Sequence, residues 1–268
     1  MCQAKSSPTP MLPSTKLASD AGKLISDPYT YRSIVGALLY ICHTRPDILF
    51  SVNRVAQFMH KPCEDHMTDV RLILRYLVGT IDYGLLFTPS DMGVGSVVAF
   101  SDVDWGNSLD DQRSTSGYYV YVDNYLVAWS FKRHKSVSRS TSEAEYRSVA
   151  DTMSEILWVN TVLKYMGIHA SSSPVVWCDN TSVVSILANP VFHSRSKHVE
   201  LDVHFVREKV VEQKVQVNYV RAEYQVADGL TKPLSKTYFQ DFRRKMSAHS
   251  IRTLLLEKGG GSRGNVEQ

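Results

Sequence analysis

One glutamate of this sequence falls on a helix face that should be apolar, and its position constrains the fold strongly. Residues 140–166 repeat with a period of roughly 3.6, which is typical of an amphipathic helix. The apolar stripe carries Val149, Met153, Ile156 and Leu163. One turn before Val149 the same stripe reaches Glu145, whereas Glu143 falls on another face and forms, with Ser140, the Ser-x-x-Glu signal of a capped helix start. Since a carboxylate among apolar side chains needs a compensating cation, we expect Glu145 to point inward to a charged site and Glu143 to face water.

Composition excludes several classes of protein. The 268 residues are 43% hydrophobic and 21% charged, which is ordinary for a globular chain and argues against general disorder. No apolar run approaches the roughly 20 residues of a membrane span, and no signal-peptide core is seen, so we expect an intracellular protein, cytoplasmic or nuclear, without a membrane partner. The four cysteines form no C-x-x-C pair, which indicates free thiols rather than a zinc ribbon. A net charge of +3 is too small to indicate nucleic-acid binding by itself.

Changes of hydrophobic period divide the chain into four parts. Residues 1–28 are rich in Ser, Pro and Thr, and we expect a disordered lead-in. Residues 29–88 have a helical period, which predicts a small bundle or appendage. Residues 95–234 combine strand and helix periods, and residues 235–268 should form one more helix and a disordered tail. The helices expected in the second part cover residues 31–40, 48–59 and 67–77.

The third part predicts an α/β domain with a mixed five-stranded sheet. Three strands come first, then a helix, a strand, two helices, a strand and a short helix, which indicates a sheet with an antiparallel hairpin at its edge. Asp123-Asn124 supplies the tight hairpin turn. The expected strands cover residues 97–104, 118–122, 125–131, 175–178 and 215–220.

Four acids from separate elements form the candidate site. Asp102 lies in the first strand, Glu145 on the inner face of the long helix, Asp179 at the end of the fourth strand and Asp228 at the start of the last helix. Convergent carboxylates repel one another unless cations lie between them. Hard divalent ions with oxygen ligands, chiefly magnesium or manganese, suit this role. Two such ions about 4 Å apart can activate a water and stabilise the leaving oxygen of a phosphodiester.

Each acid also has a simpler explanation. Asp179 could be the N-cap of the helix that begins near Thr181, and Asp228 could be a first-turn acid favoured by the helix dipole. Glu145 could lie at the solvent edge of its stripe. Asp104 competes with Asp102, because residues two apart in a strand share a face, and spacing alone does not choose between them.

Several motifs resemble the Pol polyprotein of copia-type LTR retrotransposons, in the family's order. Residues 100–234 resemble its ribonuclease H domain, and residues 29–87 resemble the thumb and connection part of the reverse transcriptase. The first match rests on Ser101-Asp102-Val103-Asp104-Trp105, Arg113-Ser114-Thr115-Ser116-Gly117-Tyr118, Ser142-Glu143-Ala144-Glu145-Tyr146, Cys178-Asp179-Asn180, His193-Ser194-Arg195-Ser196-Lys197-His198-Val199-Glu200 and Ala227-Asp228-Gly229-Leu230-Thr231-Lys232-Pro233-Leu234. The second rests on Tyr31-Arg32-Ser33-Ile34-Val35-Gly36-Ala37-Leu38-Leu39-Tyr40, Arg45-Pro46-Asp47-Ile48 and Leu74-Arg75-Tyr76-Leu77.

The resemblance implies a ribonuclease H-like fold and a specific activity. That activity is metal-dependent endonucleolytic cleavage of the RNA strand of RNA–DNA hybrids during reverse transcription. The resemblance places the catalytic and metal-ligand roles on Asp102, Glu145, Asp179 and Asp228, with two Mg²⁺ or Mn²⁺ ions, and it chooses Asp102 over Asp104.

The resemblance also implies where the polymerase site of the parent polyprotein lies. The polymerase palm should sit upstream in a parent polyprotein, whose reverse transcriptase domains would be partners of this chain. Tyr121-Val122-Asp123-Asn124 lacks the second aspartate of a polymerase hairpin, and we expect a plain turn there. The loop 221–225 lacks the histidine of cellular ribonucleases H, which predicts slow turnover. The alternative is a catalytically idle, nucleic-acid-binding remnant of a decayed polyprotein.

Two basic groups flank the predicted acid site. One precedes the long helix, and the other precedes the helix expected at 197–214. Their cations are expected to hold hybrid phosphates, while neighbouring hydroxyl and amide groups contact the sugars. The expected nucleic-acid-binding residues are Lys132, Arg133, Lys135, Arg139, Ser140, Asn180, Thr181, Arg195 and Lys197.

Overall fold

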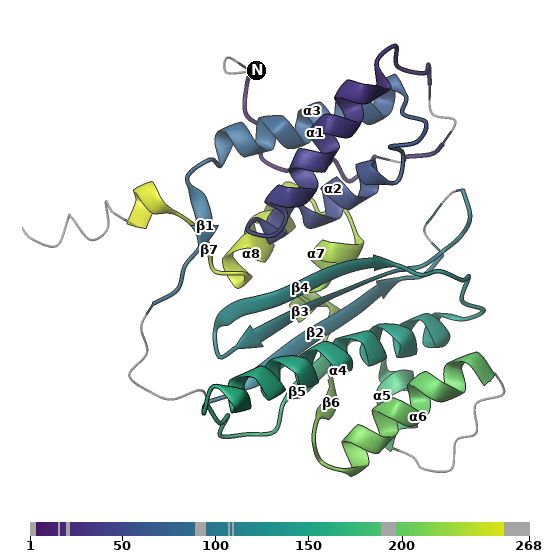
Figure 1. Cartoon of the computed structure of the whole chain (residues 1–268), viewed down its shortest axis with the longest axis vertical. Coiled ribbons are helices and arrows are strands. Elements are labelled where there is room, and N and C mark those ends of the chain that lie inside the picture. The colour runs from purple at the N-terminus through teal and green to yellow at the C-terminus, as the bar shows by residue number, and fades with distance from the viewer. Residues whose placement is uncertain are drawn as a thin grey trace, which may run out of the picture. The chain divides into compact units, whose positions relative to one another are not determined.

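The structure, a computed structural model, describes residues 4–15, 17–19, 22–88, 95–106, 108, 110–188 and 197–254, without the side chains of 188 and 197–200 (Figure 1). The chain divides into two compact units. Unit 1 combines Met1–Thr15, Asp20–Phe87 and Leu234–Gln268, and unit 2 combines Lys16–Ser19 and Thr88–Pro233. The C-terminal segment therefore belongs to the same unit as the helices at the start of the chain.

Unit 1 is mainly helical, as its sequence predicts. Its helices are α1 (Pro28–Ile41), η1 (Pro46–Ile48), α2 (Leu49–Ala56), α3 (Glu64–Gly79) and α8 (Lys236–Lys245). The start of α1 follows from Asp27, whose side chain accepts hydrogen bonds from two backbone N–H groups of the first turn. A buried polar network joins η1 to α3. Arg45 pairs with Asp47 at 2.7 Å, and the Tyr76 hydroxyl donates to the same carboxylate at 2.5 Å.

A two-stranded sheet in unit 1 has no counterpart in the sequence prediction. Strand β1 (Tyr83–Leu85) pairs antiparallel with β7 (Ala248–Ser250). Each strand has three residues, too few to show an alternating period. The adjoining helix α8 buries Phe239 and Phe242, and the ring of Phe239 meets that of Tyr76 edge-on with centroids 5.5 Å apart. The C-terminal segment thus completes the core of unit 1.

The expectation of a disordered lead-in is not met in residues 4–15. This segment has no helix or strand, but its backbone forms hydrogen bonds with α3. The N–H of Ser7 donates to the carbonyl of Arg75 at 3.3 Å, and the Arg75 side chain donates to the carbonyl of Lys5 at 2.7 Å. Met11 is 4% exposed. The Ser- and Pro-rich composition of this segment gave no indication that Met11 would be buried. Residues 1–3 and the predicted tail at 255–268 lie outside the described residues.

Unit 2 contains the mixed five-stranded sheet that the sequence predicts. The strand order is β4-β3-β2-β5-β6, with β2, β3 and β4 antiparallel and β2, β5 and β6 parallel. This order, with helices flanking the sheet, is that of the ribonuclease H-like fold and confirms the expected fold class. The strands are β2 (Val97–Asp104), β3 (Thr115–Val122), β4 (Tyr125–Arg133), β5 (Val175–Cys178) and β6 (Gln216–Tyr219).

The Asp123-Asn124 segment is the expected hairpin turn. Asp123 has a φ of 54°, and its side chain accepts hydrogen bonds from the N–H groups of Gly95 and Ser96 at 2.9 and 2.8 Å. Asp123 therefore has a structural role in the turn between β3 and β4.

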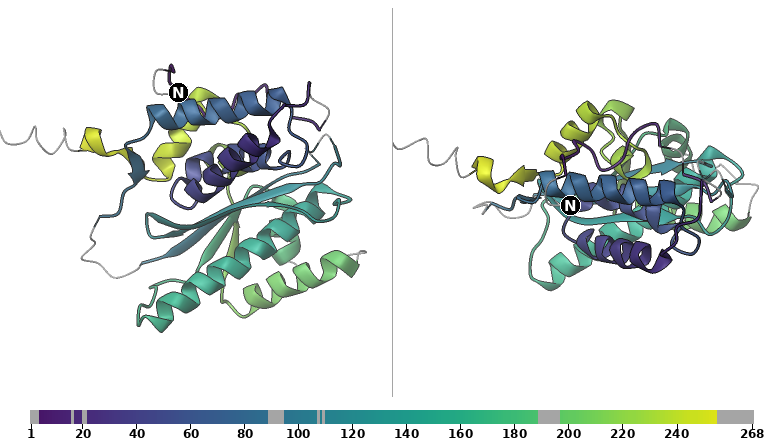
Figure 2. Two further views of the ribbon diagram at one scale, coloured as in Figure 1. Left: turned by 45° about the horizontal axis from the view of Figure 1, so that its top comes forward. Right: turned by 90° about the horizontal axis from the view of Figure 1, so that it is seen from above.

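Three helices of unit 2 cover one face of the sheet (Figures 1 and 2). Helix α4 (Thr141–Tyr165) packs against β2 and β3, and α6 (Lys197–Val211) lies alongside α4, with α5 (Thr181–Ala188) next to both. The shared core includes Val97, Val149, Met153, Ile156 and Val176. The short elements η2 (Ala222–Tyr224) and α7 (Asp228–Thr231) follow β6, and α7 contacts β2 and β3.

Two findings concern membrane spans and cysteines in the described residues. None of their helices has the length and apolar character required to span a lipid bilayer. Cys42, Cys63 and Cys178 are buried free thiols, while Cys2 lies outside the described part of the chain.

Candidate metal centre

Three acids from three elements converge at one end of the sheet of unit 2. Ligand oxygens of Asp102, Glu145 and Asp179 all lie within 4.8 Å of one another. Strands β2 and β5 are parallel neighbours with Phe100 opposite Trp177, so the residues two further along, Asp102 and Asp179, arrive at the same edge. The first turns of α4 carry Glu145 to this edge. The expected convergence is therefore present for these three acids.

The alternation of β2 places Asp102 on the face opposite α4. Ser101 faces α4, where its hydroxyl lies 2.8 Å from that of Ser148. Asp102 points the other way and accepts a hydrogen bond from the Thr231 hydroxyl of α7. The Ser148 hydroxyl also donates to the carbonyl of Asp102 at 3.0 Å. Asp102 is 2% exposed, whereas Asp104 is only partly buried and lies outside the cluster, so the geometry selects Asp102.

The start of α4 confirms one half of the glutamate prediction and corrects the other. Glu145 is 5% exposed and points inward, which excludes the solvent-edge alternative. The Ser140 hydroxyl accepts the N–H of Glu143 at 3.1 Å, as the capping signal predicts. However, Glu143 does not face water. It is 9% exposed, because its carboxylate accepts the N–H of Arg139 and pairs with Arg147 at 2.8 Å.

Asp179 is not the cap of the helix that follows it. The side-chain oxygen of Asn180 accepts the N–H groups of Ser182 and Val183 at 3.0 and 3.2 Å and thereby caps α5. The Oδ1 atom of Asp179 and the Oε2 atom of Glu145 are buried, and no described residue donates a hydrogen bond to either of them.

Burial dominates the electrostatics of the cluster. It raises the pKa of Asp102 to about 7, a shift that the charge of Lys232 opposes and that of Asp228 reinforces. Burial also raises the pKa of Glu145 to about 9, with further contributions from the charges of Asp102 and Asp179. The pKa of Asp179 is raised by burial as well. Clustered hard oxygens, two of them unpartnered, are a donor set that fits a hard divalent cation.

The fourth predicted acid adjoins the cluster but faces a lysine. Asp228 opens α7, and its Oδ1 accepts a hydrogen bond from Nζ of Lys232 at 2.8 Å. The same Nζ lies 3.8 Å from Oδ2 of Asp102. Lys232 belongs to the motif at 227–234, but no role was expected for it from the sequence. Its i, i+4 spacing from Asp228 is the signal that could have identified the pair.

Two further contacts position α7, and neither was expected from the sequence. Gln225 is buried in the loop where cellular ribonucleases H often carry a histidine, and its amide donates to the carbonyl of Ser101 at 2.9 Å. Gly117 of β3 lies under Leu230 of α7. A Cβ at Gly117 would lie 2.5 Å from Cβ of Leu230, so a glycine permits this close approach.

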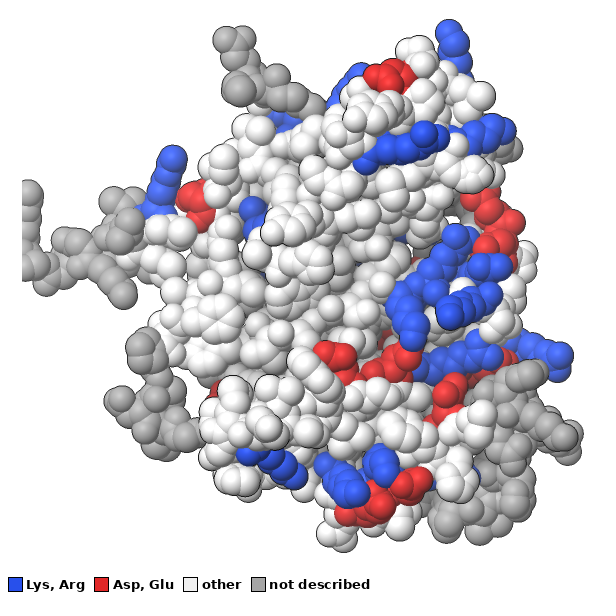
Figure 3. All heavy atoms as spheres, viewed as in Figure 1, with Lys and Arg blue, Asp and Glu red and all other residues white. Residues whose placement is uncertain are grey.

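The basic residues predicted to bind nucleic acid are partly engaged within the protein. Lys132 pairs with Asp151 at 2.7 Å, and Arg133 pairs with Asp111. On the face shown in Figure 3, basic and acidic side chains adjoin one another and do not form an unbroken basic surface. Lys135 is exposed and belongs to the same basic group.

The other residues predicted to bind nucleic acid are exposed, act as helix caps or lie outside the described residues. Arg139 and Thr181 are exposed near the first turns of α4 and α5, while Ser140 and Asn180 act as helix caps. Arg195 and the side chain of Lys197 lie outside the described residues. The nucleic-acid contacts of all these residues stay predictions.

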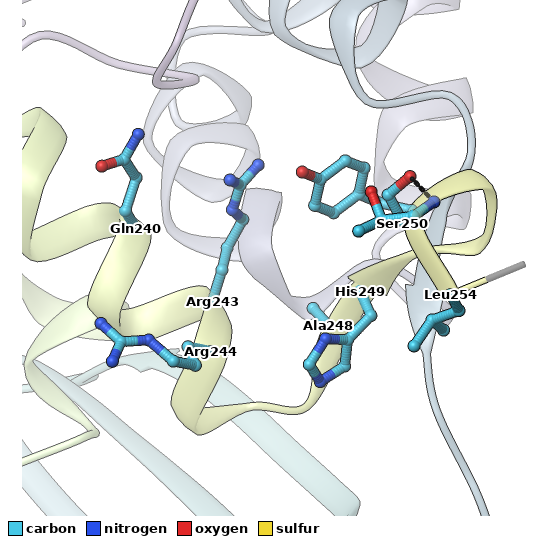
Figure 4. Close-up of a pocket in the computed structure, with 9 residues that line it drawn as sticks. Gln240, Arg243, Arg244, Ala248, His249, Ser250 and Leu254 are labelled. Atoms are coloured by element: carbon cyan, nitrogen blue, oxygen red, sulfur yellow. Dashed lines mark hydrogen bonds between the residues drawn. The ribbon is translucent and has the colours of Figure 1, made fainter. Parts of the chain in front are cut away.

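Unit 1 has a hollow of about 200 Å³ that also gathers basic side chains (Figure 4). Arg243, Arg244 and His249 line it, but the labelled side chains do not converge on one point. The guanidinium of Arg243 lies 4.5 Å from the ring centroid of Tyr83, and Arg244 pairs with Asp241 at 2.8 Å. This hollow therefore lacks the convergent polar groups that the acid cluster has.

Comparison with known proteins identifies close relatives. No protein-family model matches the chain. The chain is 47% identical over 251 residues to the retrovirus-related Pol polyprotein from transposon RE1 of Arabidopsis thaliana. This match covers 94% of this chain and 17% of the polyprotein. It is 33% identical over 242 residues to the retrovirus-related Pol polyprotein from transposon TNT 1-94 of Nicotiana tabacum. That match covers 90% of this chain and 18% of the polyprotein. The chain thus spans less than a fifth of these relatives' length.

Solved structures with a related fold include LC11-RNase H1 in complex with an RNA/DNA hybrid. That structure is 11% identical to this chain, with a TM-score of 0.39. The match covers 50% of this chain and 93% of the LC11-RNase H1 chain. The fold of unit 2 follows from the order and directions of its strands.

Proposed function

The chain belongs to the retrovirus-related Pol polyproteins of transposons, and from that premise we propose that unit 2 is a ribonuclease H that cleaves the RNA strand of RNA–DNA hybrids during reverse transcription. One observation carries the proposal. The carboxylates of the buried Asp102 and Glu145 and of the partly buried Asp179 meet at the end of a mixed sheet, and two of their oxygens have no hydrogen-bond partner among the described residues. Such a cluster is costly unless cations bind to it.

The three clustered acids would hold divalent cations, with the partly exposed Asp228 beside them as a further ligand. Bound Mg²⁺ or Mn²⁺, two ions in the proposal, would supply the activated water and the charge that the phosphodiester cleavage requires. Because burial raises the pKa values of Asp102 and Glu145, these residues must release protons before they can act as ligands. Metal affinity should therefore rise with pH.

Exposed groups near the cluster would hold the substrate. Lys135 and Arg139 precede α4 and are exposed, so phosphates of the hybrid can approach them. Thr181 is exposed at the start of α5 and offers a hydroxyl for a sugar contact. The helices between residues 29 and 88 would be the thumb and connection remnant, and reverse transcriptase domains upstream in the parent polyprotein would be partners.

Cleavage of a labelled RNA–DNA hybrid in Mg²⁺ tests the proposal. The intact chain should cut the RNA strand and leave 3′-hydroxyl and 5′-phosphate ends, while a DNA duplex of the same sequence stays intact. Asp179→Asn should lower the rate by about 100-fold or more, because it removes a ligand of the cations that would stabilise the charge of the transition state. Asp104→Asn, which changes an acid outside the cluster, is the matched control and should retain the rate.

The outcomes discriminate between the hypotheses. Equal rates for the intact chain and Asp179→Asn would remove the proposed site. Binding of the hybrid with metal-dependent stabilisation, but without any cleavage, would instead support the catalytically idle remnant.

A further inference from the structure

Lys232 lies on the exposed side of the acid cluster. The side chain of Lys232 is 44% exposed, while its Nζ lies 2.8 Å from Oδ1 of Asp228 and 3.8 Å from Oδ2 of the buried Asp102. Its ammonium group therefore bridges the partly exposed Asp228 and the buried Asp102.

The bridge does not follow from regular helix geometry. Helix α7 ends at Thr231, and Lys232 already has extended backbone angles, with φ −130° and ψ 147°. The side chain of Lys232 nevertheless turns back toward the cluster instead of pointing into solvent. An ordinary i, i+4 surface pair would bring Lys232 to Asp228 alone and would be worth only about 0.2–0.5 kcal/mol.

The charge of Lys232 acts on every member of the cluster. It lowers the pKa values of Asp102, Glu145 and Asp179, in each case against the effect of burial. In the described part of the chain, no other cation is among the leading influences on the pKa values of all three carboxylates. The nearby basic residues Lys132 and Arg133 are paired with other acids.

We propose that Lys232 is a positioning residue of the acid cluster, which holds Asp228 in place before metal binds and competes with divalent cations for Asp228 and Asp102. The inference rests on the proposed function, because it assumes that the cluster binds metal. Its consequence is that Lys232 sets the concentration of Mg²⁺ that the site requires. A bound ion must displace the ammonium from the two carboxylates or bind close to a like charge.

The test is a Mg²⁺ titration of the whole chain without nucleic acid, followed by thermal melting. Lys232→Met keeps most of the side-chain volume and removes the charge, whereas Lys232→Arg keeps the charge. Lys209→Met, which removes a lysine of α6 paired with Glu208 and Glu212, is the control for loss of a surface cation. The titrations are made at pH 8.5, where protons compete less with the metal.

Lys232→Met should lower the Mg²⁺ concentration for half-maximal stabilisation by about tenfold, the order expected when a unit charge near a divalent ion is removed from a largely hydrated site. Lys232→Arg and Lys209→Met should keep the wild-type concentration. Damage to the fold would weaken Mg²⁺ binding, so the direction of the change separates the proposed role from a structural one.

An unchanged or higher Mg²⁺ requirement in Lys232→Met would overturn the inference, even if the intact chain binds Mg²⁺ and cleaves the hybrid. Failure of the intact chain both to respond to Mg²⁺ and to cleave would overturn the proposed function, and the role of Lys232 with it. The two failures are thus distinguishable.

Discussion

Replacing Asp102 by asparagine should make the metal-free protein more stable at alkaline pH. Asp102 is 2% exposed, and burial raises its pKa from 3.8 to about 7. The folded protein therefore binds this proton more tightly than the unfolded chain does. By linkage, the free energy of unfolding falls as the pH rises from about 4 to about 7, and the loss persists above that range.

The size of the effect follows from the pKa shift. At about 1.4 kcal/mol for each pKa unit, a shift from 3.8 to about 7 corresponds to about 4 kcal/mol of destabilisation above pH 7. Asparagine cannot ionise, and its side-chain oxygen can still accept the hydrogen bond from Thr231. Asp102→Asn should therefore gain about 4 kcal/mol relative to the wild type at pH 8 and less than half of that at pH 5.

Urea denaturation in EDTA, followed by tryptophan fluorescence, measures this difference. All four tryptophans lie in unit 2, so the signal reports the unit that holds the cluster. They are Trp105, Trp129, Trp158 and Trp177. Asp104→Asn removes an acid from the same strand outside the cluster and should show no comparable gain. An Asp102→Asn variant that is less stable than the wild type at pH 8, or whose gain is equal at both pH values, would refute the reasoning.

Three further predictions concern the elements around the site and the core of unit 1. Gly117→Ala places a methyl group against Leu230, so α7 must shift, and hybrid cleavage should fall by about tenfold; Gly36→Ala, with open space at its Cβ, should leave the rate unchanged. Ser140→Ala removes the cap of α4 and should cost about 1 kcal/mol in urea denaturation followed by tryptophan fluorescence. Phe239→Ala leaves a cavity in unit 1 and should cost about 3–5 kcal/mol, measured by circular dichroism in urea; a cost below about 1 kcal/mol would show that the C-terminal segment is not part of that core.

Local patterns in the sequence were sufficient for the elements of unit 2 and for the direction of one critical side chain. The 3.6-residue period of 140–166 correctly placed Glu145 inside, because helix geometry relates residues one turn apart whatever surrounds them. The alternation of 97–104 and the turn at Asp123-Asn124 likewise predicted β2 and the β3–β4 hairpin. Motif order supplied the family and three acids that do converge.

Only the tertiary structure decided which partner each polar group meets. Glu143 is buried because Arg147 and the backbone of Arg139 reach it, and Asn180 rather than Asp179 caps α5. The pairing of β1 with β7 joins segments on either side of unit 2 in the sequence, and Lys232 turns back into the acid cluster after its helix has ended. Periodicity describes neighbours within one element, whereas burial, ion pairing and pKa depend on what other elements bring to the same place.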